Sequence, residues 1–180
     1  MRVFVLCTGR CGSMTFARAC RHISNYTSGH ETRSRRYTGR LRYPDQHIEV
    51  DNRLSWMLGL LDATYGDDPV YVHLQRDYEA VLDSYKRRTR SATGIVPAFA
   101  HGIIQSAECA DYEQATRLML DTVRANINLF LRDKSKVIRL RIEHPHDGFT
   151  RMWDMIGADG DPKAALAELG NRHNPRRRAT

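Results

Sequence analysis

Two apolar runs stand out in the hydrophobic pattern of the chain, an unbroken one at residues 3–7 and one at residues 70–74 that only His73 interrupts. Such runs are typical of strands that helices cover on both faces, as in a parallel sheet. Shorter apolar or alternating patterns predict three more strands, at residues 23–28, 48–50 and 136–142. The pattern therefore predicts a sheet of several strands rather than a helical bundle.

Apolar residues at helical spacing follow most of these predicted strands. They predict helices at residues 14–20, 53–65, 78–85, 113–132, 149–156 and 162–169. Ser13, Asp77 and Asp161 precede three of these helices and suit N-cap positions. Strands that alternate with helices predict an α/β fold, here a three-layer parallel sheet flanked by helices.

The length of 180 residues fits one domain, which we expect to cover residues 1–170, followed by a basic C-terminal tail at 171–180. Residues 87–102 have the composition of a loop. That loop is either a lid over a binding site or a plain connection between helices.

The net charge of +7 and the pI near 9.5 favour an anionic ligand or partner. Five arginines lie within residues 32–42. Most runs of charge are solvated, so a basic surface loop is the favoured interpretation of this segment. The alternative is a wall that attracts an acidic substrate.

The four cysteines form no CxxC pair, which favours reduced thiols and no bound metal. The chain has no apolar run long enough for a signal peptide or a membrane span. We therefore expect a cytoplasmic protein that does not span a membrane.

The first predicted strand leads directly into Thr8-Gly9-Arg10-Cys11-Gly12-Ser13 and then into a helix that starts with Met14-Thr15. Glycine permits backbone angles that other residues resist, and the N–H groups at the start of a helix attract anions. Arg10 adds a positive charge. Residues 8–15 thus predict a cradle for an anion, although a tight turn that binds nothing has the same pattern.

This cradle differs from two common nucleotide-binding loops. A Walker A loop needs Gly-x-x-x-x-Gly-Lys-Ser/Thr, whereas the glycines here are three positions apart and no Gly-Lys pair follows. The Gly-x-Gly-x-x-Gly pattern of dinucleotide-binding loops is also absent. The loop therefore suits a phosphate-like group but not ordinary magnesium-dependent hydrolysis of a nucleoside triphosphate.

Further polar residues are expected at the same edge of the sheet. Arg76 follows the strand at 70–74, and Ser84 lies about two helical turns beyond it. His30 and Glu31 follow the short strand at 23–28. Because the carboxyl ends of parallel strands form one rim, these side chains should surround one ligand site.

The pair of motifs, Thr8 to Ser13 and Leu74-Gln75-Arg76-Asp77 with Ser84, resembles the nucleotide-binding motifs of sulfotransferases that use 3′-phosphoadenosine 5′-phosphosulfate (PAPS). The resemblance implies a P-loop NTPase-like sulfotransferase fold. It implies that Thr8, Gly9, Arg10, Cys11, Gly12, Ser13, Met14 and Thr15 hold the 5′-phosphosulfate. It also implies that Arg76 and Ser84 hold the 3′-phosphate. Many members have lysine in the first loop, and Arg10 corresponds to the arginine of bacterial-type members.

The resemblance also implies a reaction, the transfer of a sulfuryl group from PAPS to a hydroxyl or amine of a sugar, glycan or small alcohol. Glu31 falls where glycan-type and bacterial members have their general base, His30 is the second candidate, and His47 is a distant third. Arg10 would stabilise the leaving 5′-phosphate, and no metal is required.

Two other classes remain open at this stage. A P-loop nucleotide or small-molecule kinase requires a Gly-Lys-Ser/Thr loop, which is missing. A nucleic-acid-binding protein is compatible with the charge, but no predicted helix combines a basic face with aromatic residues, so no nucleic-acid partner is expected. The sequence specifies neither the acceptor nor the oligomeric state.

Overall fold

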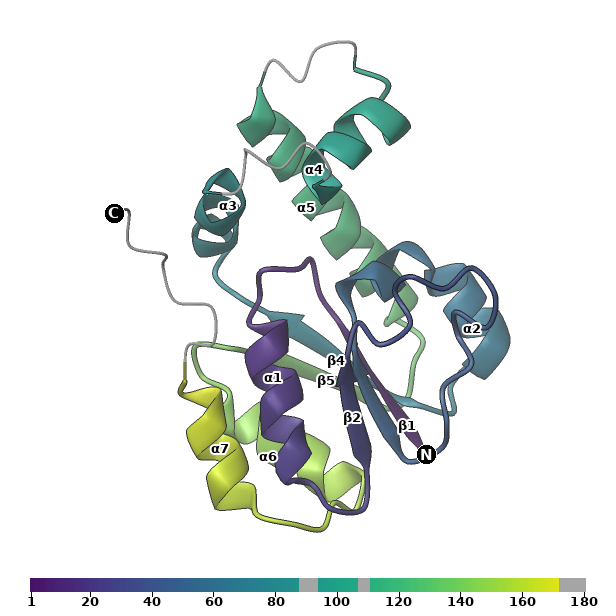
Figure 1. Cartoon of the computed structure of the whole chain (residues 1–180), viewed down its shortest axis with the longest axis vertical. Helices are drawn as coiled ribbons and strands as arrows, with labels where there is room; N and C mark the ends of the chain where they lie inside the picture. The colour runs from purple at the N-terminus through teal and green to yellow at the C-terminus, as the bar shows by residue number, and fades with distance from the viewer. Residues whose placement is uncertain (88–93, 107–110, 172–180) are drawn as a thin grey trace.

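A computed structural model describes residues 1–87, 94–106 and 111–171. Figure 1 shows a central sheet with helices around it. The strands are β1 (Arg2–Leu6), β2 (Thr27–His30), β3 (His47–Val50), β4 (Val70–Gln75) and β5 (Val137–Arg141). All neighbouring pairs are parallel, and the order across the sheet is β2-β3-β1-β4-β5.

Helices connect the strands and cover the sheet. They are α1 (Ser13–Ala19), α2 (Leu58–Tyr65), α3 (Tyr78–Lys86), α4 (Ile95–Ala98), α5 (Tyr112–Phe130), α6 (His146–Met155) and α7 (Pro162–Leu169). Two tighter 3-10 turns, η1 (Cys20–His22) and η2 (Asn52–Trp56), and one wider π-helical turn, η3 (Phe99–Ile103), join them. The structure thus confirms an α/β fold with a parallel sheet between helical layers.

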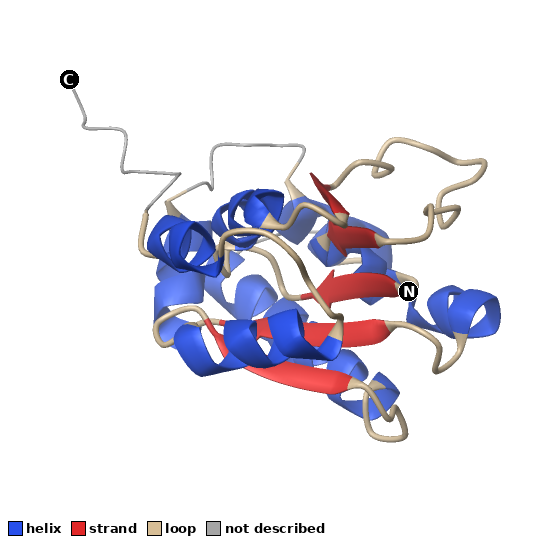
Figure 2. Cartoon of the chain, turned by 90° about the horizontal axis from the view of Figure 1, so that it is seen from below, coloured by secondary structure: helices blue, strands red, loops and turns tan. Residues whose placement is uncertain are grey.

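The two faces of β1 belong to two different cores, which explains its unbroken apolar run. Val3 and Val5 pack in the core formed with α1, α6 and α7, whereas Phe4 and Leu6 pack in the core beneath α2 and α5. All four side chains are fully buried. Figure 2 shows helices on both sides of the strands.

The second predicted strand is shorter and lies later in the chain than residues 23–28. Ile23 instead forms an isolated bridge to Gly160, and the N–H of Ser24 donates to the carbonyl of Asp159. This segment is therefore held by the C-terminal part of the chain rather than by the sheet. As a result His30 is the last residue of β2 and Glu31 follows it directly.

Two further expectations need correction. The helix expected over 53–65 is divided into η2 and α2, because Met57 between them has a non-helical backbone with φ −124° and ψ 28°. The segment 87–102, expected as a loop, contains α4 and most of η3, while residues 88–93 lie outside the described residues. The tail prediction likewise concerns residues 172–180, which lie outside them.

Two of the three expected N-caps are confirmed. Asp77 and Asp161 accept hydrogen bonds from backbone N–H groups of the first turns of α3 and α7. Ser13 is not the N-cap of α1. Gly12 takes that position with a φ of 83° and without a side-chain hydrogen bond, because its left-handed backbone turns the chain into the helix.

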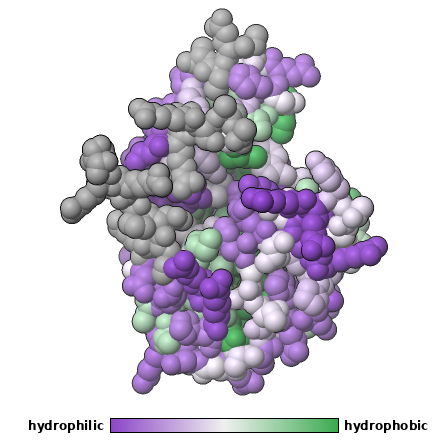
Figure 3. All heavy atoms as spheres, in the orientation of Figure 1, coloured by the Kyte–Doolittle hydropathy of each residue, from purple (hydrophilic) through white to green (hydrophobic). Residues whose placement is uncertain are grey.

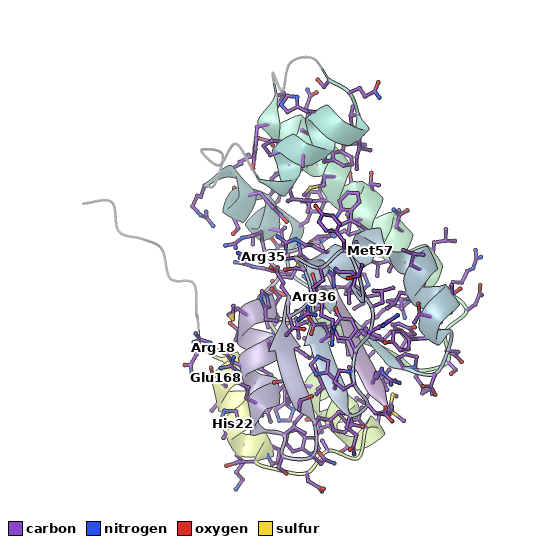
Figure 4. The ribbon with its side chains drawn as sticks, turned by 45° about the vertical axis from the view of Figure 1, so that its right-hand side comes forward. Arg18, His22, Arg35, Arg36, Met57 and Glu168 are labelled. Atoms are coloured by element: carbon purple, nitrogen blue, oxygen red, sulfur yellow. The ribbon has the colours of Figure 1, made fainter. Side chains whose placement is uncertain are left out.

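The C-terminal helix α7 packs against α1 and thereby joins the two ends of the described chain. Figure 4 shows Arg18 of α1 and Glu168 of α7 close together at the outer edge of this contact. Within the three described ranges, no helix combines the length and apolar character that crossing a membrane requires.

Candidate functional site

The polar residues predicted from the sequence gather at the carboxyl edge of the sheet. The chain leaves β1 toward β2 on one side, whereas it leaves β4 toward β5 on the other side. Adjacent strands whose connections diverge in this way open a crevice, which is the usual ligand site of open α/β sheets. The 8–15 segment follows β1, and Arg76 follows β4, so both border this crevice.

The turn after β1 depends on left-handed backbone. Gly9, Arg10 and Gly12 have φ values of 80°, 59° and 83°. A Cβ on Gly9 would lie 2.6 Å from the hydroxyl oxygen of Tyr85 and 2.8 Å from the amide nitrogen of Asn52. Glycine is therefore required at position 9 both by the backbone angle and by the available space.

Neighbouring elements hold this turn through its carbonyl groups. The Tyr85 hydroxyl donates to the carbonyl of Thr8 at 2.7 Å, and the Ser55 hydroxyl donates to that of Cys7 at 3.1 Å. Both side chains are buried. The turn is thus fixed from α3 on one side and from η2 on the other, as a preorganised binding loop would need to be.

Two buried thiols lie inside the turn. A hydrogen bond to Cys11, together with burial, raises the pKa of Cys7. The hydrogen bond from Cys7 outweighs burial and lowers the pKa of the Cys11 thiol. Cys7, Cys11 and Cys20 are free cysteines in the described chain, and Cys109 lies outside the described residues.

Arg10, Arg76 and Ser84 come together as the sequence predicted. The Nε atom of Arg10 donates to the Ser84 hydroxyl at 3.0 Å, and one Nη atom of Arg76 donates to the Arg10 carbonyl at 3.0 Å. Ser84 is only 6% exposed, so its hydroxyl is fixed in a buried position. Two guanidinium groups held by one turn create a strongly positive local field.

The other polar side chains of the 8–15 segment face different partners. The Thr8 hydroxyl contacts the carbonyl of Gly9 and the sulfur of Cys11, each at 3.2 Å. The Thr15 hydroxyl donates to the carbonyl of Asn171 at 3.3 Å. Met14 is half-buried and has no polar side-chain group that could bind an oxyanion. This segment would therefore hold an anion mainly through its backbone and Arg10.

His30 lies beside the cradle, whereas Glu31 pairs with a different group. The Nε2 atom of His30 is 2.9 Å from the Ser13 hydroxyl at the start of α1. Glu31 has a φ of 53°, and its carboxylate forms an ion pair of 2.6 Å with Arg53. The two base candidates are adjacent in sequence, but only His30 makes a direct contact with the cradle.

An open cleft of about 450 Å³ lies between His30, Glu31 and the arginine-rich segment of residues 32–42. Its walls are His30, Glu31, Thr32, Ser34, Arg35, Arg36 and Arg53. Figure 3 shows the most hydrophilic part of this face over the segment that joins β2 to β3. Figure 4 places Arg35 and Arg36 toward the ends of the strands. A basic cleft thus adjoins the cradle through His30.

The arginines of residues 32–42 have different roles. Arg40 is buried and forms an ion pair of 2.5 Å with the fully buried Asp51. Burial raises the pKa of Asp51, although its hydrogen bonds with the Arg53 N–H and with Arg40 oppose that shift. Arg35 and Arg36 are exposed and line the cleft. The favoured interpretation, a solvated loop, is therefore wrong for Arg40.

Sequence reasoning missed the role of Glu49, which is completely buried in β3. Its carboxylate accepts two hydrogen bonds of 2.7 Å from Thr32 and lies 3.0 Å from the Nε2 atom of His47. Burial opposes ionisation, but the hydrogen bonds from His47 and Thr32 outweigh it and lower the pKa of Glu49. The sequence feature that could have indicated this role is a charged residue between the apolar residues Ile48 and Val50. This network fixes the turn that carries Glu31.

In the described part of the chain, no three His, Cys, Asp or Glu side chains form a group suited to a metal ion. Comparison of the whole chain with protein-family models, with curated proteins and with solved structures finds no match.

Proposed function

We propose that this protein is a sulfotransferase that uses PAPS as its sulfuryl donor. The observation that carries the proposal is the contact of Arg10, Ser84 and Arg76, which lie far apart in sequence and meet at the carboxyl edge of the sheet. These are the groups that the resemblance assigns to the two phosphates of the donor. Their positions beside a glycine turn support a ligand with two separate anionic groups.

The donor would bind across the crevice between β1 and β4. Arg10 and the backbone of the turn would hold the 5′-phosphate, on which negative charge grows as the sulfuryl group leaves. Arg76 and Ser84 would hold the 3′-phosphate. Ser84 already accepts a hydrogen bond from Arg10, so one buried hydroxyl would link both phosphate positions.

The acceptor would bind in the basic cleft and attack the sulfur atom. The bond between sulfur and the donor phosphate oxygen breaks, a bond between sulfur and the acceptor oxygen forms, and the acceptor proton passes to a protein base. Arg53 contacts Oε2 of Glu31, so Glu31 would take that proton on Oε1 or after it releases Arg53. His30 contacts the cradle through Ser13, so both residues are kept as candidates and are separated by the tests below.

The basic lining of the cleft supports an acceptor that itself carries negative charge. Arg35 and Arg36 are exposed there and belong to no ion pair between described side chains. Exposed arginines attract anions over roughly 8–10 Å at physiological ionic strength. A hydroxyl acceptor with a nearby carboxylate, phosphate or sulfate would satisfy them.

A P-loop kinase is less well supported. The carboxylate that ends β3, Asp51, is where a magnesium ligand would be sought, but it is fully buried and paired with Arg40. Its hydrogen bonds to Arg40 and to the Arg53 N–H occupy both carboxylate oxygens. That arrangement makes Asp51 part of a buried structural ion pair.

Calorimetry with 3′-phosphoadenosine 5′-phosphate, ATP and 5′-AMP tests the proposal. We expect the bisphosphate to bind most tightly, and Arg76→Gln to remove that preference, because the 3′-phosphate loses a charge-assisted hydrogen bond. Arg132→Gln, an exposed arginine beyond the end of α5, is the matched control. Equal binding of the three nucleotides, or tighter binding of ATP, would refute the sulfotransferase proposal.

A further inference from the structure

A second cavity, of about 390 Å³, opens on the face of the sheet that α5 covers. Its walls are His73, Gln75, Arg76, Asp77, Tyr78, Arg124, Asn128 and Arg141. Arg76 is the one wall residue that also belongs to the proposed donor site, and none of the wall residues lies in the 8–15 cradle or in the basic cleft. The volume falls within the range of about 300–1,000 Å³ that is typical of small-molecule sites.

His73 lies in the wall of this cavity and has a ring nitrogen without a hydrogen-bond partner. It lies on β4, is 2% exposed, and its Nδ1 atom has no hydrogen-bond partner among the described residues. Burial, and secondarily Arg139 and Arg124, lowers its pKa to about 4. The ring is therefore neutral near pH 7. A buried polar atom without a partner is costly, so a turn of the His73 ring toward a ligand in the cavity would supply the missing hydrogen bond.

Three arginines make the cavity positive. Arg124 reaches from α5, donates to the carbonyl of Arg76 at 3.1 Å and lies 4.7 Å above the Tyr78 ring. Arg141 is exposed and lies 3.8 Å from Glu143. The single carboxylate in the wall, Asp77, already caps α3 through the N–H of Ala80. The cavity thus offers more positive charge than its own acidic group neutralises.

We propose that this cavity is a second binding site, specific for a small organic molecule that carries a phosphate or sulfate ester group. Arg124 and Arg141 bind the tetrahedral oxyanion, since guanidinium groups match its oxygens with paired N–H donors. His73 and the Asn128 amide bind polar atoms of the organic part. The site does not depend on the proposed transferase activity.

Arg76 lies between the cradle and the cavity, so the test must separate the two. Its side chain donates to Arg10 in the cradle, and its carbonyl accepts from Arg124 in the cavity. The Arg10→Gln variant removes the cradle's own charge and leaves every residue of the cavity wall in place. Binding that persists in Arg10→Gln and is lost when Arg124 is also replaced by glutamine therefore reports on the cavity rather than on the cradle.

The experiment titrates the Arg10→Gln protein with inorganic phosphate, inorganic sulfate and phenyl phosphate at low salt. Binding is followed by calorimetry and by the imidazole nitrogen resonances of His73 in NMR, assigned from their absence in His73→Gln. We expect one site, tighter binding of phenyl phosphate than of either inorganic anion, and a shift of the His73 Nδ1 resonance. Similar affinities for inorganic phosphate and inorganic sulfate would indicate that the site accepts either type of ester. Tighter binding of one anion would identify the ester that the site takes.

Variants of the cavity wall complete the test. Arg124→Gln should weaken phenyl phosphate at least about tenfold, and Asn128→Ala, on the exposed side of α5, should weaken it by a smaller factor. Arg132→Gln should leave it unchanged. The proposal is overturned if phenyl phosphate does not bind, if Arg124→Gln binds it as tightly as the parent protein, or if the His73 resonance does not move at saturation.

Discussion

Replacement of Gly9 by alanine should destabilise the protein because the cradle has no room for a methyl group. The new Cβ would approach the Tyr85 hydroxyl to 2.6 Å and would occupy a backbone with a φ of 80°. Left-handed backbone costs an L-residue about 1–2 kcal/mol. Loss of the Tyr85 hydrogen bond to Thr8 adds about 0.5–1.5 kcal/mol. The expected loss is therefore about 1.5–3.5 kcal/mol.

A second glycine supplies the matched control for this substitution. Gly59 lies in α2, and a Cβ there would meet nothing within 4 Å. Gly59 is the second residue of α2, and alanine in a helix is preferred over glycine by up to about 1 kcal/mol, so Gly59→Ala should stabilise the protein by at most that amount. The same chemical change is thus expected to have opposite signs at the two positions.

Equilibrium unfolding in urea measures both changes through the midpoint and the slope of the transition. The double variant Gly9→Ala with Tyr85→Phe removes the hydroxyl that the methyl group would meet. Its destabilisation should be smaller than the sum of the two single changes, because both lose the same hydrogen bond. A Gly9→Ala protein as stable as the parent, or strict additivity in the double variant, would show that the reasoning from Cβ contacts is wrong.

Four further outcomes are expected. Arg76→Gln should weaken 3′-phosphoadenosine 5′-phosphate by roughly 10–100-fold, and 5′-AMP much less, in calorimetry. If Glu31 is the base, Glu31→Gln should lower the turnover number by at least about 100-fold with nucleotide affinity retained; if His30→Gln does so instead, His30 is the base. Arg36→Gln should raise KM for an anionic acceptor more than for a neutral one, an effect that added salt should diminish. Because the folded-state pKa of His73 is lowered to about 4, the unfolded chain binds more protons than the folded protein at acidic pH. Stability should therefore fall by up to about 3 kcal/mol as the pH drops from about 6.5 to 4, and His73→Gln should flatten this slope in urea titrations.

The elements with strong local signals could be predicted from the sequence. The first strand, the glycine turn and the helix after it follow one another with distinct residue types, and they occur within one residue of the expected bounds. The meeting of Arg10 with Arg76 and Ser84 could also be predicted. It requires only that parallel strands end at the same edge of the sheet.

The contacts that tertiary packing decides could not be predicted. The strand β2 is polar because it lies at the edge of the sheet, so its sequence lacks the apolar signal of β1. The Glu31 partner, Arg53, comes from beyond the following strand, and spacing along the chain gives no indication of that pairing. The burial of Arg40 depends equally on a distant carboxylate, because a run of arginines does not reveal which of them is neutralised.

The packing of α7 against α1 has a consequence for how this protein is made. The segment after α1 is held by late residues: the Tyr26 hydroxyl donates to the carbonyl of Ile156, 130 positions further on. Position 160, which bridges to Ile23, requires glycine because a Cβ there would lie 2.1 Å from the carbonyl oxygen of His22. A ribosome that adds about 5–20 residues per second needs roughly 7–26 s to cover that interval. During this time the nascent strand, turn and helix that begin the chain lack the helix that covers them, so the apolar face of α1 stays exposed until α7 has been made.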